Sequence, residues 1–305
     1  MRISISYLYP IFKYGYPHSV DDAIKSLPEI RELGFRFLEM EGLGQHNLRE
    51  VYERRSEIKR VLDNCGLHVH NFCVVDPDLV NLNPEIRRPA LERFRMGAEV
   101  ADLFGCETLH LASYSPPVEY LESQPYQLSG NGGYKFEDVT RLRVPPGFKW
   151  EEVWKALVES TQVCADIAAE RSRKILMEPR IGEVICSVDS LLRLLEHVNR
   201  PNLKANFDTG HFSAQRENVV LALAKLKGRF ANVHVSDNNP STSDHLPIGE
   251  GSIDWVEFIS ELHRMGFDGY LGLDFGLTDK LTDNYRKSAE RLQAIASDLK
   301  IPMEI

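Results

Sequence analysis

The sequence predicts an α/β fold, a (β/α)8 TIM barrel, from three observations. Eight short apolar runs alternate with longer segments in which apolar residues recur at the three-and-four spacing of amphipathic helices. The apolar runs begin 33, 32, 39, 67, 29, 27 and 40 residues apart, and one strand–helix unit needs about 30 residues. Glycines stand shortly before several runs, as is typical of helix ends. Strict alternation of eight such units favours a closed barrel.

The elements can be assigned in order along the chain. Segment 87–104 has the clearest helical pattern, and Asp254 followed by Glu257 indicates the start of another helix. The apolar face of segment 87–104 is expected to hold Leu91, Phe94, Ala98, Ala101 and Leu103. The helix-ending glycines are Gly34, Gly66, Gly105, Gly228 and Gly266. The strands are expected at residues 3–8, 36–40, 68–75, 107–112, 174–178, 203–208, 230–235 and 270–275.

The single oversized interval predicts a long loop insertion after the fourth strand, at residues 113–149. This segment is rich in proline and glycine, and long ordered loops in compact domains are usually functional. We expect a lid or a surface for a partner. A doubly wound open sheet that binds a nucleotide is the alternative fold, but no G-x-G-x-x-G motif follows the first strand. The whole chain, 1–305, is therefore expected to form one barrel domain.

Composition excludes several classes of protein. The chain has 305 residues, is 43% hydrophobic and carries a formal charge of −9, which disfavours non-specific binding to nucleic acid. Its five cysteines are an odd number and form no C-x-x-C pair, so a disulfide framework and a structural zinc site are not expected. The opening residues do not resemble a secretory signal, and no apolar stretch is long enough to cross a bilayer. We expect a cytoplasmic protein without a membrane partner.

Ionisable residues recur at the carboxyl ends of the expected strands, where barrels of this kind have their active sites. They are His110, Glu178, Asp208, His234 and Asp274, with His211 in the turn after the sixth strand and His68 and His70 on the third. Three carboxylates and one imidazole from four successive strands form a mixed oxygen and nitrogen ligand set. Such a set suits Mn²⁺, Mg²⁺ or Co²⁺, and Zn²⁺ less distinctly. His68 is expected to lie deeper, in the core.

Four segments carry a resemblance to a known family. They are Met177-Glu178-Pro179-Arg180, Asn206-Phe207-Asp208-Thr209-Gly210-His211, Asn232-Val233-His234-Val235-Ser236-Asp237 and His245-Leu246-Pro247-Ile248-Gly249-Glu250-Gly251. Together they resemble the xylose isomerase-like TIM-barrel superfamily. Within it they are most similar to the sugar (phosphate) isomerase/epimerase branch, which includes tagatose/psicose 3-epimerases and hydroxypyruvate isomerases. The resemblance covers nearly the whole chain.

The resemblance implies one divalent metal ion, most plausibly Mn²⁺, held by Glu178, Asp208, His234 and Asp274. The family usually has glutamate at the fourth position. There it faces the first glutamate across the substrate, and the two glutamates remove and return the substrate proton on opposite faces of the same carbon. Because Asp274 is one methylene shorter, it can serve as a ligand and yet fail to reach the carbon. The implied chemistry is proton abstraction next to a metal-chelated carbonyl through an enediolate, with Glu178 as the base.

Further residues are candidates for contact with the substrate. The resemblance implies that His211 bonds a substrate oxygen, and Arg180 can orient a hydroxyl, carboxylate or phosphate group or form a rim salt bridge. His70 and His110 match metal-binding positions of the endonuclease IV relatives, and we expect both to line the site, with His110 as an acid or base. Tyr7 and Tyr114 belong to an aromatic group that can form an apolar wall for a sugar.

The leading hypothesis is a metal-dependent isomerase or epimerase of a keto sugar or sugar derivative, as a possible homo-oligomer. A second hypothesis is a lyase or hydrolase of 3-oxo-glycosides that uses the same metal site. It resembles C-glycoside deglycosidase catalytic subunits, which pair with a small β-rich partner. A remote third is an endonuclease IV-like repair enzyme, but that branch needs an Asp-x-His after the seventh strand, and Ser243 stands two residues before His245. A barrel without turnover is disfavoured, because a buried carboxylate cluster repels itself.

Overall fold

The eight expected strands form a closed parallel barrel. The computed structural model describes residues 1–121, 141–239, 244–276 and 280–305. Around the barrel the strands follow the order β1-β10-β9-β8-β7-β4-β3-β2, which confirms the predicted fold class. The barrel strands are β1 (Arg2–Ile5), β2 (Phe37–Leu43), β3 (His68–Val75), β4 (Thr108–Ala112), β7 (Lys174–Glu178), β8 (Leu203–Asp208), β9 (Phe230–Val235) and β10 (Tyr270–Leu273).

Three strand ends differ from the predicted ones: β1 ends at Ile5, three residues before the predicted end, and the differences in β2 and β10 matter at the barrel mouth. β2 continues to Leu43, three residues beyond the predicted end, because its register with β3 runs on from Phe37 to Leu43. β10 ends at Leu273, so Asp274 is the first residue of the following loop and not part of the strand. The longer β2 carries a second acidic residue, Glu41, up to the carboxyl end of the barrel.

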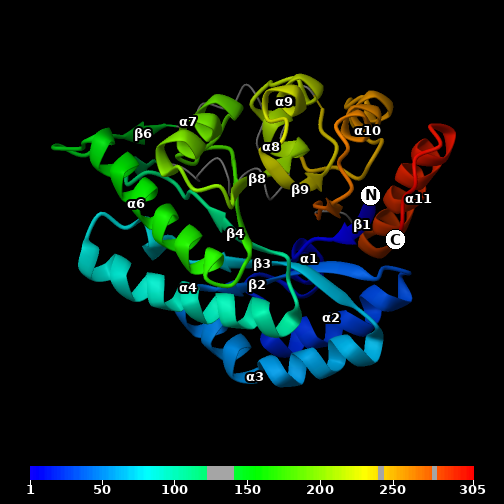
Figure 1. The fold of residues 1–305 in the computed structure, drawn as a ribbon, viewed down its shortest axis with the longest axis horizontal. Helices are drawn as coiled ribbons and strands as arrows, with labels where there is room; N and C mark the ends of the chain where they lie inside the picture. Colours follow the sequence, from blue (N-terminus) through cyan, green and yellow to red (C-terminus); the bar gives the residue numbers. More distant parts are fainter. Residues whose placement is uncertain (122–140, 240–243, 277–279) are drawn as a thin grey trace.

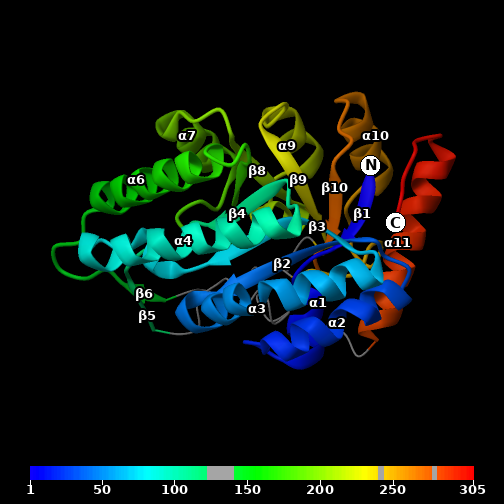
Figure 2. The ribbon, with the colours of Figure 1, turned by 60° about the horizontal axis from the view of Figure 1, so that its bottom comes forward.

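Helices cover the outside of the barrel, as Figures 1 and 2 show. The amino and carboxyl ends lie side by side next to β1 and α11, where Ile3 N donates to Glu304 O at 2.7 Å. The helices are α1 (Leu8–Tyr14), α2 (Val20–Glu32), α3 (Gly44–Cys65), η1 (Pro77–Val80), α4 (Pro84–Phe104), α6 (Trp150–Ala169), α7 (Val188–Val198), α8 (Thr209–Ala214), α9 (Val219–Lys225), α10 (Trp255–Arg264) and α11 (Leu281–Asp298).

Local sequence signals place the helix ends. Ser19 and Asp22 form a reciprocal capping box at the start of α2, and the Asp254 side chain accepts from Glu257 N at the start of α10. α3 and α4 end at Gly66 and Gly105, which have φ angles of 62° and 79°, the left-handed region that glycine adopts without strain. These ends agree with the predicted ones.

The apolar core lies between the strands and the helices. α4 turns Phe94, Ala98 and Ala101 inward, as its spacing predicts, but Leu103 is 39% exposed and the next residue, Phe104, is buried instead. Gly97 lets α4 approach β3 closely, because a Cβ at this position would lie 2.5 Å from a Val74 methyl carbon. The sequence pattern therefore located the buried face of α4 correctly, except at its last turn.

The expected insertion lies between β4 and α6. It contains a short antiparallel pair, β5 (Glu119–Tyr120) and β6 (Leu142–Arg143), at the edge of the molecule (Figure 2). Residues 122–140 of the predicted segment 113–149 are outside the described residues. A role as a lid or partner surface stays a prediction.

Two further expectations concern the chain as a whole. All five cysteines are free thiols, in agreement with the expected absence of disulfides. Among the described residues, no helix combines the length and the apolar character that crossing a bilayer requires.

Candidate metal centre and active site

Four side chains converge at the carboxyl ends of four neighbouring strands. Glu178 and Asp208 end β7 and β8, His234 is near the end of β9, and Asp274 directly follows β10. The imidazole lies at the centre: its Nδ1 is 2.7 Å from Glu178 Oε1 and 3.7 Å from both Asp208 Oδ2 and Asp274 Oδ1. Each of these residues is at most 5% exposed. The four predicted ligands are thus next to one another.

Three atoms at the centre of this cluster have unused hydrogen-bonding capacity. Asp208 Oδ2, His234 Nδ1 and Asp274 Oδ1 are buried and form no hydrogen bond with any residue that the structure describes. Buried polar atoms nearly always have partners, and adjacent buried carboxylates repel one another. A divalent cation would satisfy all three atoms and cancel the repulsion, so the donor set fits a metal ion with mixed oxygen and nitrogen ligands.

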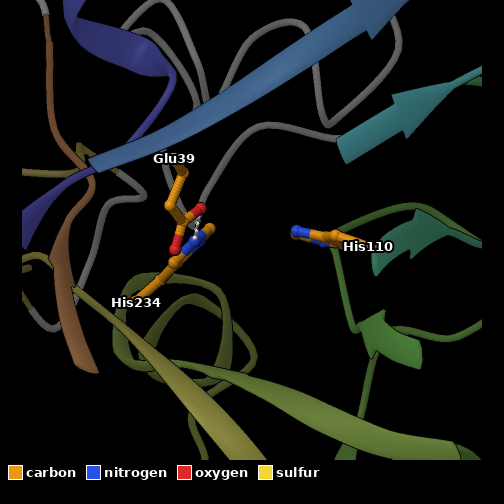
Figure 3. Close-up of side chains that lie close together, drawn as sticks. All are labelled: Glu39, His110 and His234. Carbon is orange, nitrogen blue, oxygen red and sulfur yellow. Dashed lines mark hydrogen bonds and ion pairs between the residues drawn. The ribbon is translucent and has the colours of Figure 1, made fainter. Parts of the chain in front are cut away.

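Glu39, which the sequence analysis did not single out, holds the other side of the His234 ring. Its Oε2 lies 2.9 Å from His234 Nε2, and Figure 3 shows this pair from β2 and β9 with the His110 ring directed toward it from β4. Burial alone would raise the pKa of Glu39, but the His234 imidazole lowers it to about 2. A carboxylate that accepts from the second ring nitrogen orients a metal-binding histidine and increases its basicity. We therefore assign Glu39 to positioning His234.

Two asparagines extend this contact into a series of hydrogen bonds that ends at Glu178. Asn232 Nδ2 donates to Glu39 Oε1 at 2.8 Å and to Asn206 Oδ1 at 2.9 Å. Asn206 Nδ2 in turn donates to Glu178 Oε1 at 2.6 Å. The same Glu178 oxygen lies 2.7 Å from His234 Nδ1, so this series of hydrogen bonds leads from one side of the imidazole back to the other. It fixes the orientation of the carboxylate and of the imidazole together.

Replacing Glu39 with glutamine is expected to weaken Mn²⁺ binding by about 10- to 100-fold, the usual cost of removing the partner of a metal-binding histidine. Glutamine keeps the size of the side chain but removes the charge that acts on His234. Titration calorimetry of the metal-free protein with Mn²⁺ measures the effect. Glu107→Gln is the matched control, because Glu107 pairs with His68 and Tyr270 and is half exposed. Equal Mn²⁺ affinity of Glu39→Gln and wild type would contradict the positioning role.

Arg180 and Tyr7 flank the second oxygen of Glu178. Arg180 Nε donates to Glu178 Oε2 at 2.5 Å, and Arg180 Nη2 donates to the Tyr7 hydroxyl at 2.9 Å. Burial would raise the pKa of Glu178, but the Arg180 guanidinium and the neighbouring His234 imidazole hold it well below its usual value. Glu178 is therefore ionised at neutral pH. The structure thus brings Arg180 and Tyr7 next to Glu178, and their contacts with a substrate stay predictions.

Three histidines line the remaining sides of the cluster. His110 Nε2 lies 3.6 Å from Glu178 Oε2, and His211 N donates to Asp208 Oδ1 at 2.8 Å. His245 packs against the His211 ring, with its Nδ1 3.7 Å from Asp274 Oδ2. Burial lowers the pKa of His211 to about 4, whereas the contact with Asp274 outweighs burial and raises the pKa of His245 to about 9. The neutral imidazole of His211 can accept or donate a hydrogen bond, and the charged ring of His245 can only donate.

Other close groups of ligand atoms involve the same side chains. Ligand atoms of Glu39, His110 and His234 lie near one another, as do those of Asp208, His211 and His245. In the first group the Glu39 and His234 atoms bond each other, so they are already satisfied. The group of Glu178, Asp208 and His234 belongs to the four-residue cluster with Asp274, and it shares Asp208 with the group of Asp208, His211 and His245, which also contains buried atoms without hydrogen bonds among the described residues.

His70 lies elsewhere in the barrel. It bonds Ser4 Oγ through Nε2 at 3.0 Å, and its ring stacks on Tyr270, the first residue of β10, with 3.8 Å between ring centroids. His70 Nε2 also lies 3.6 Å from Glu39 Oε1, on the far side of Glu39 from His234, and a contact between His70 and substrate stays a prediction. His68 is not in the core either, because its side chain is 40% exposed and pairs with Glu107.

Tyr114 connects two loops at the barrel mouth through its hydroxyl group and its backbone. Its hydroxyl accepts from Asp76 N at 2.6 Å, and its backbone N donates to Glu183 Oε2 at 2.8 Å. The same Glu183 oxygen accepts from the backbone and the hydroxyl of Ser113, both at 3.0 Å. Glu183, another residue that the sequence analysis missed, thus ties the loop after β4 to the loop after β7. A substrate contact for Tyr114 stays a prediction.

Asp237 orders the loop after β9 that carries His245. Its two buried carboxylate oxygens accept from Gly249 N at 2.8 Å, from Ile253 N at 3.1 Å and from Trp255 Nε1 at 2.9 Å. These bonds fix the chain on both sides of the Gly-Glu-Gly turn. His245 is thereby held against Asp274.

Comparison with known proteins agrees with this fold. The family model for the xylose isomerase-like TIM barrel matches residues 27–295. The L-ribulose-5-phosphate 3-epimerase UlaE of Salmonella heidelberg (strain SL476) is 26% identical over 255 residues, 81% of this chain and 79% of the relative. A D-tagatose 3-epimerase-like protein superposes with a TM-score of 0.73 at 21% identity and covers 98% of each chain. The 3-keto-D-glucoside 4-epimerase YcjR from E. coli has a TM-score of 0.72 at 16% identity, over 96% of this chain and 99% of its own.

Proposed function

We propose, from the premise that the chain belongs to the xylose isomerase-like TIM-barrel family, that it is a divalent-metal-dependent epimerase or isomerase of a keto sugar or sugar derivative. One observation carries the proposal. Three buried ligand atoms without hydrogen bonds among the described residues face one another next to an ionised carboxylate, Glu178. The relatives that the chain resembles are sugar epimerases, which supports a small sugar as substrate.

Glu178, Asp208, His234 and Asp274 would hold one ion, for which Mn²⁺ is our first choice and Mg²⁺, Co²⁺ or Zn²⁺ are alternatives. When bound, the ion would supply a Lewis acid that polarises the substrate carbonyl. Glu39 and the two asparagines would keep the His234 and Glu178 side chains in place. These contacts support a preformed site.

Glu178 is the proposed base. Arg180 keeps it ionised, which is the form that accepts a proton from the carbon next to the carbonyl. His110 Nε2 faces the same carboxylate and makes no hydrogen bond with the described residues, so it is free to bond a substrate hydroxyl. His211 would bond a second substrate oxygen. Arg180, bonded to both Glu178 and Tyr7, would orient the substrate close to the base.

A lyase acting on a 3-oxo-glycoside is the second candidate, and one observation favours it. Both oxygens of the short Asp274 carboxylate are directed at histidines, His234 and His245, so Asp274 is poorly placed as a second base. Elimination needs only the first deprotonation. A homo-oligomer is proposed for the epimerase, and a small β-rich partner subunit for the lyase. We propose a cytoplasmic location for either, and no role for nucleic acid.

The test begins with elemental analysis of protein purified without chelators or affinity nickel. We expect about one divalent ion per chain, the number that a single four-ligand cluster holds. The protein is then incubated in D2O with L-ribulose 5-phosphate, D-tagatose, D-psicose and a 3-oxo-glucoside, and the reaction is followed by NMR. Deuterium at the carbon next to the carbonyl with a new epimer or isomer supports the proposal, and an unsaturated product supports the lyase. No bound metal, even after incubation with excess Mn²⁺, would refute both.

A further inference from the structure

A second buried carboxyl group lies at the barrel mouth and has no role in the mechanism above. Glu41 is 6% exposed, and its Oε1 makes no hydrogen bond with the described part of the chain. His18 Nδ1 is 3.8 Å away, and it is equally buried and also without a hydrogen bond there. Buried polar groups of this kind are rare in a structural role, because leaving them without partners costs stability.

The strand register directs Glu41 into the barrel. Glu39 points inward because it bonds His234, and residues two apart on a strand share a face, so Glu41 points inward one step closer to the carboxyl end. Glu41 pairs with Cys73 on β3, and Cys73 pairs with His110 on β4. The register therefore links Glu41 through Cys73 to His110, whose Nε2 lies 3.6 Å from Glu178 Oε2.

Glu41 faces the metal ligands from across the barrel. The path from β2 to β8 is four strands long in either direction, through β1, β10 and β9 or through β3, β4 and β7. The ligands occupy β7 to β10, and the opposite half carries Glu41 and His110. Glu41, His18 and Tyr7 also line a small cavity of about 20 Å³, much of whose lining comes from α2 and from the outward-facing residues of β2. Glu41 is therefore on the strand opposite β8, and Arg180 and Asp274 are near enough to act on the pKa of its carboxyl group.

The surroundings of Glu41 keep it protonated. Burial raises the pKa of Glu41 to about 8, against the opposing effect of Arg180 and with a further increase from Asp274. Burial also lowers the pKa of His18, so this imidazole is neutral and does not draw the proton away. The titratable groups that face Glu41 from neighbouring elements are His18, Tyr16, Cys73, Arg180 and Asp274.

We propose that Glu41 is the second proton-transfer residue of this site and acts on the substrate face opposite Glu178, an inference that rests on the proposed function. It takes the place that Asp274 leaves open, since the Asp274 oxygens are directed at His234 and His245. His18 is a positioning residue, with its Nδ1 3.8 Å from Glu41 Oε1.

The proposed step balances without any further reactant. Glu178 removes the proton from the carbon next to the carbonyl, and the electron pair of that bond enters the double bond of the enediolate. Glu41 gives its proton to the same carbon from the other face, and the electron pair of the double bond forms the new bond to hydrogen. Glu41 ends as a carboxylate and Glu178 as an acid, and exchange with solvent restores both.

Glu41→Gln separates the two halves of this reaction. With L-ribulose 5-phosphate, D-tagatose or D-psicose in D2O, the variant is expected to bind metal normally and to exchange the substrate proton near the wild-type rate. Epimer formation is expected to fall by at least about 100-fold, the usual contribution of an acid or base group. Wild-type epimer formation by Glu41→Gln would overturn the inference and leave the proposed function intact. Equal loss of exchange and epimerisation would also overturn it.

A second readout needs no substrate. Infrared difference spectra recorded between about pH 6 and about pH 10 are expected to show the band of a protonated carboxyl group in wild type. This band should disappear as the group titrates near pH 8, and it should be missing in Glu41→Gln. Glu32→Gln, which alters an exposed carboxylate at the end of α2, is the matched control and should keep this signal. Absence of the signal from wild type would overturn the inference. Failure of wild type to turn over any sugar would instead refute the proposed function, and the inference with it.

Discussion

Glu178→Gln is expected to lower turnover by about 10²- to 10⁴-fold, the range that a positioned general base contributes. The amide has the same shape and can still accept a hydrogen bond from Asn206 or Arg180, which the carboxylate does at 2.6 Å and 2.5 Å. It cannot accept a proton from carbon. NMR detection of solvent deuterium in the substrate, at saturating Mn²⁺, measures the loss.

Two variants make this result specific. Glu178→Asp keeps the charge but withdraws it by one methylene, so an intermediate loss is expected. Glu152→Gln removes an exposed carboxylate at the start of α6 and should leave turnover unchanged. If Glu178→Gln keeps wild-type proton exchange while the metal content stays the same, Glu178 is not the base, and the enolising mechanism needs another one.

Glu41→Gln is expected to stabilise the protein in a pH-dependent manner. The pKa of Glu41 rises from 4.5 to about 8 on folding. The wild-type free energy of unfolding therefore contains a contribution that is fully present below pH 4.5 and is lost as the pH rises through about 8. Glutamine cannot ionise and escapes this loss. At about 1.4 kcal/mol per pKa unit, the variant should be more stable by about 3–5 kcal/mol at pH values above the folded-state pKa, and by almost nothing at pH 4.

Urea unfolding at several pH values checks this expectation, with Glu32→Gln as the exposed control that should show no such trend. A stability difference that does not vary with pH would mean that Glu41 does not titrate on folding as described. The expected outcome has a functional meaning. A protein that keeps a destabilising buried carboxyl group, when glutamine would be more stable, retains it for activity.

Much of this protein follows from its sequence. The alternation of apolar runs and amphipathic segments determined eight strands, their order along the chain and the barrel that they form. The four candidate metal ligands could be predicted by the same reasoning. Glu178 and Asp208 end their strands, His234 nearly does and Asp274 directly follows its strand, and the carboxyl ends of parallel strands in a barrel meet at one face. Residues at strand ends are therefore placed together by topology alone.

Residues inside the strands could not be placed in this way. Alternation shows that Glu39 and Glu41 share a face of β2, but not whether that face is turned toward the helices or toward the barrel interior. Two acidic residues within an otherwise apolar strand were the available signal. Only the closed barrel brings Glu39 to His234, 195 positions away in the sequence.

The height of a residue along the barrel axis could not be predicted from the sequence either. His70 and His110 are both on barrel strands. His70 nevertheless lies beside Tyr270, the first residue of β10, whereas His110 lies beside Glu178, the last residue of β7. Strands in a barrel are staggered relative to one another, and this shear sets which residues lie at one level. The sequence by itself determined the fold and the grouping of the four candidate ligands. The tertiary structure alone decided which inward-facing residues lie next to the four candidate ligands, because the stagger arises from pairing between strands and has no local sequence signal.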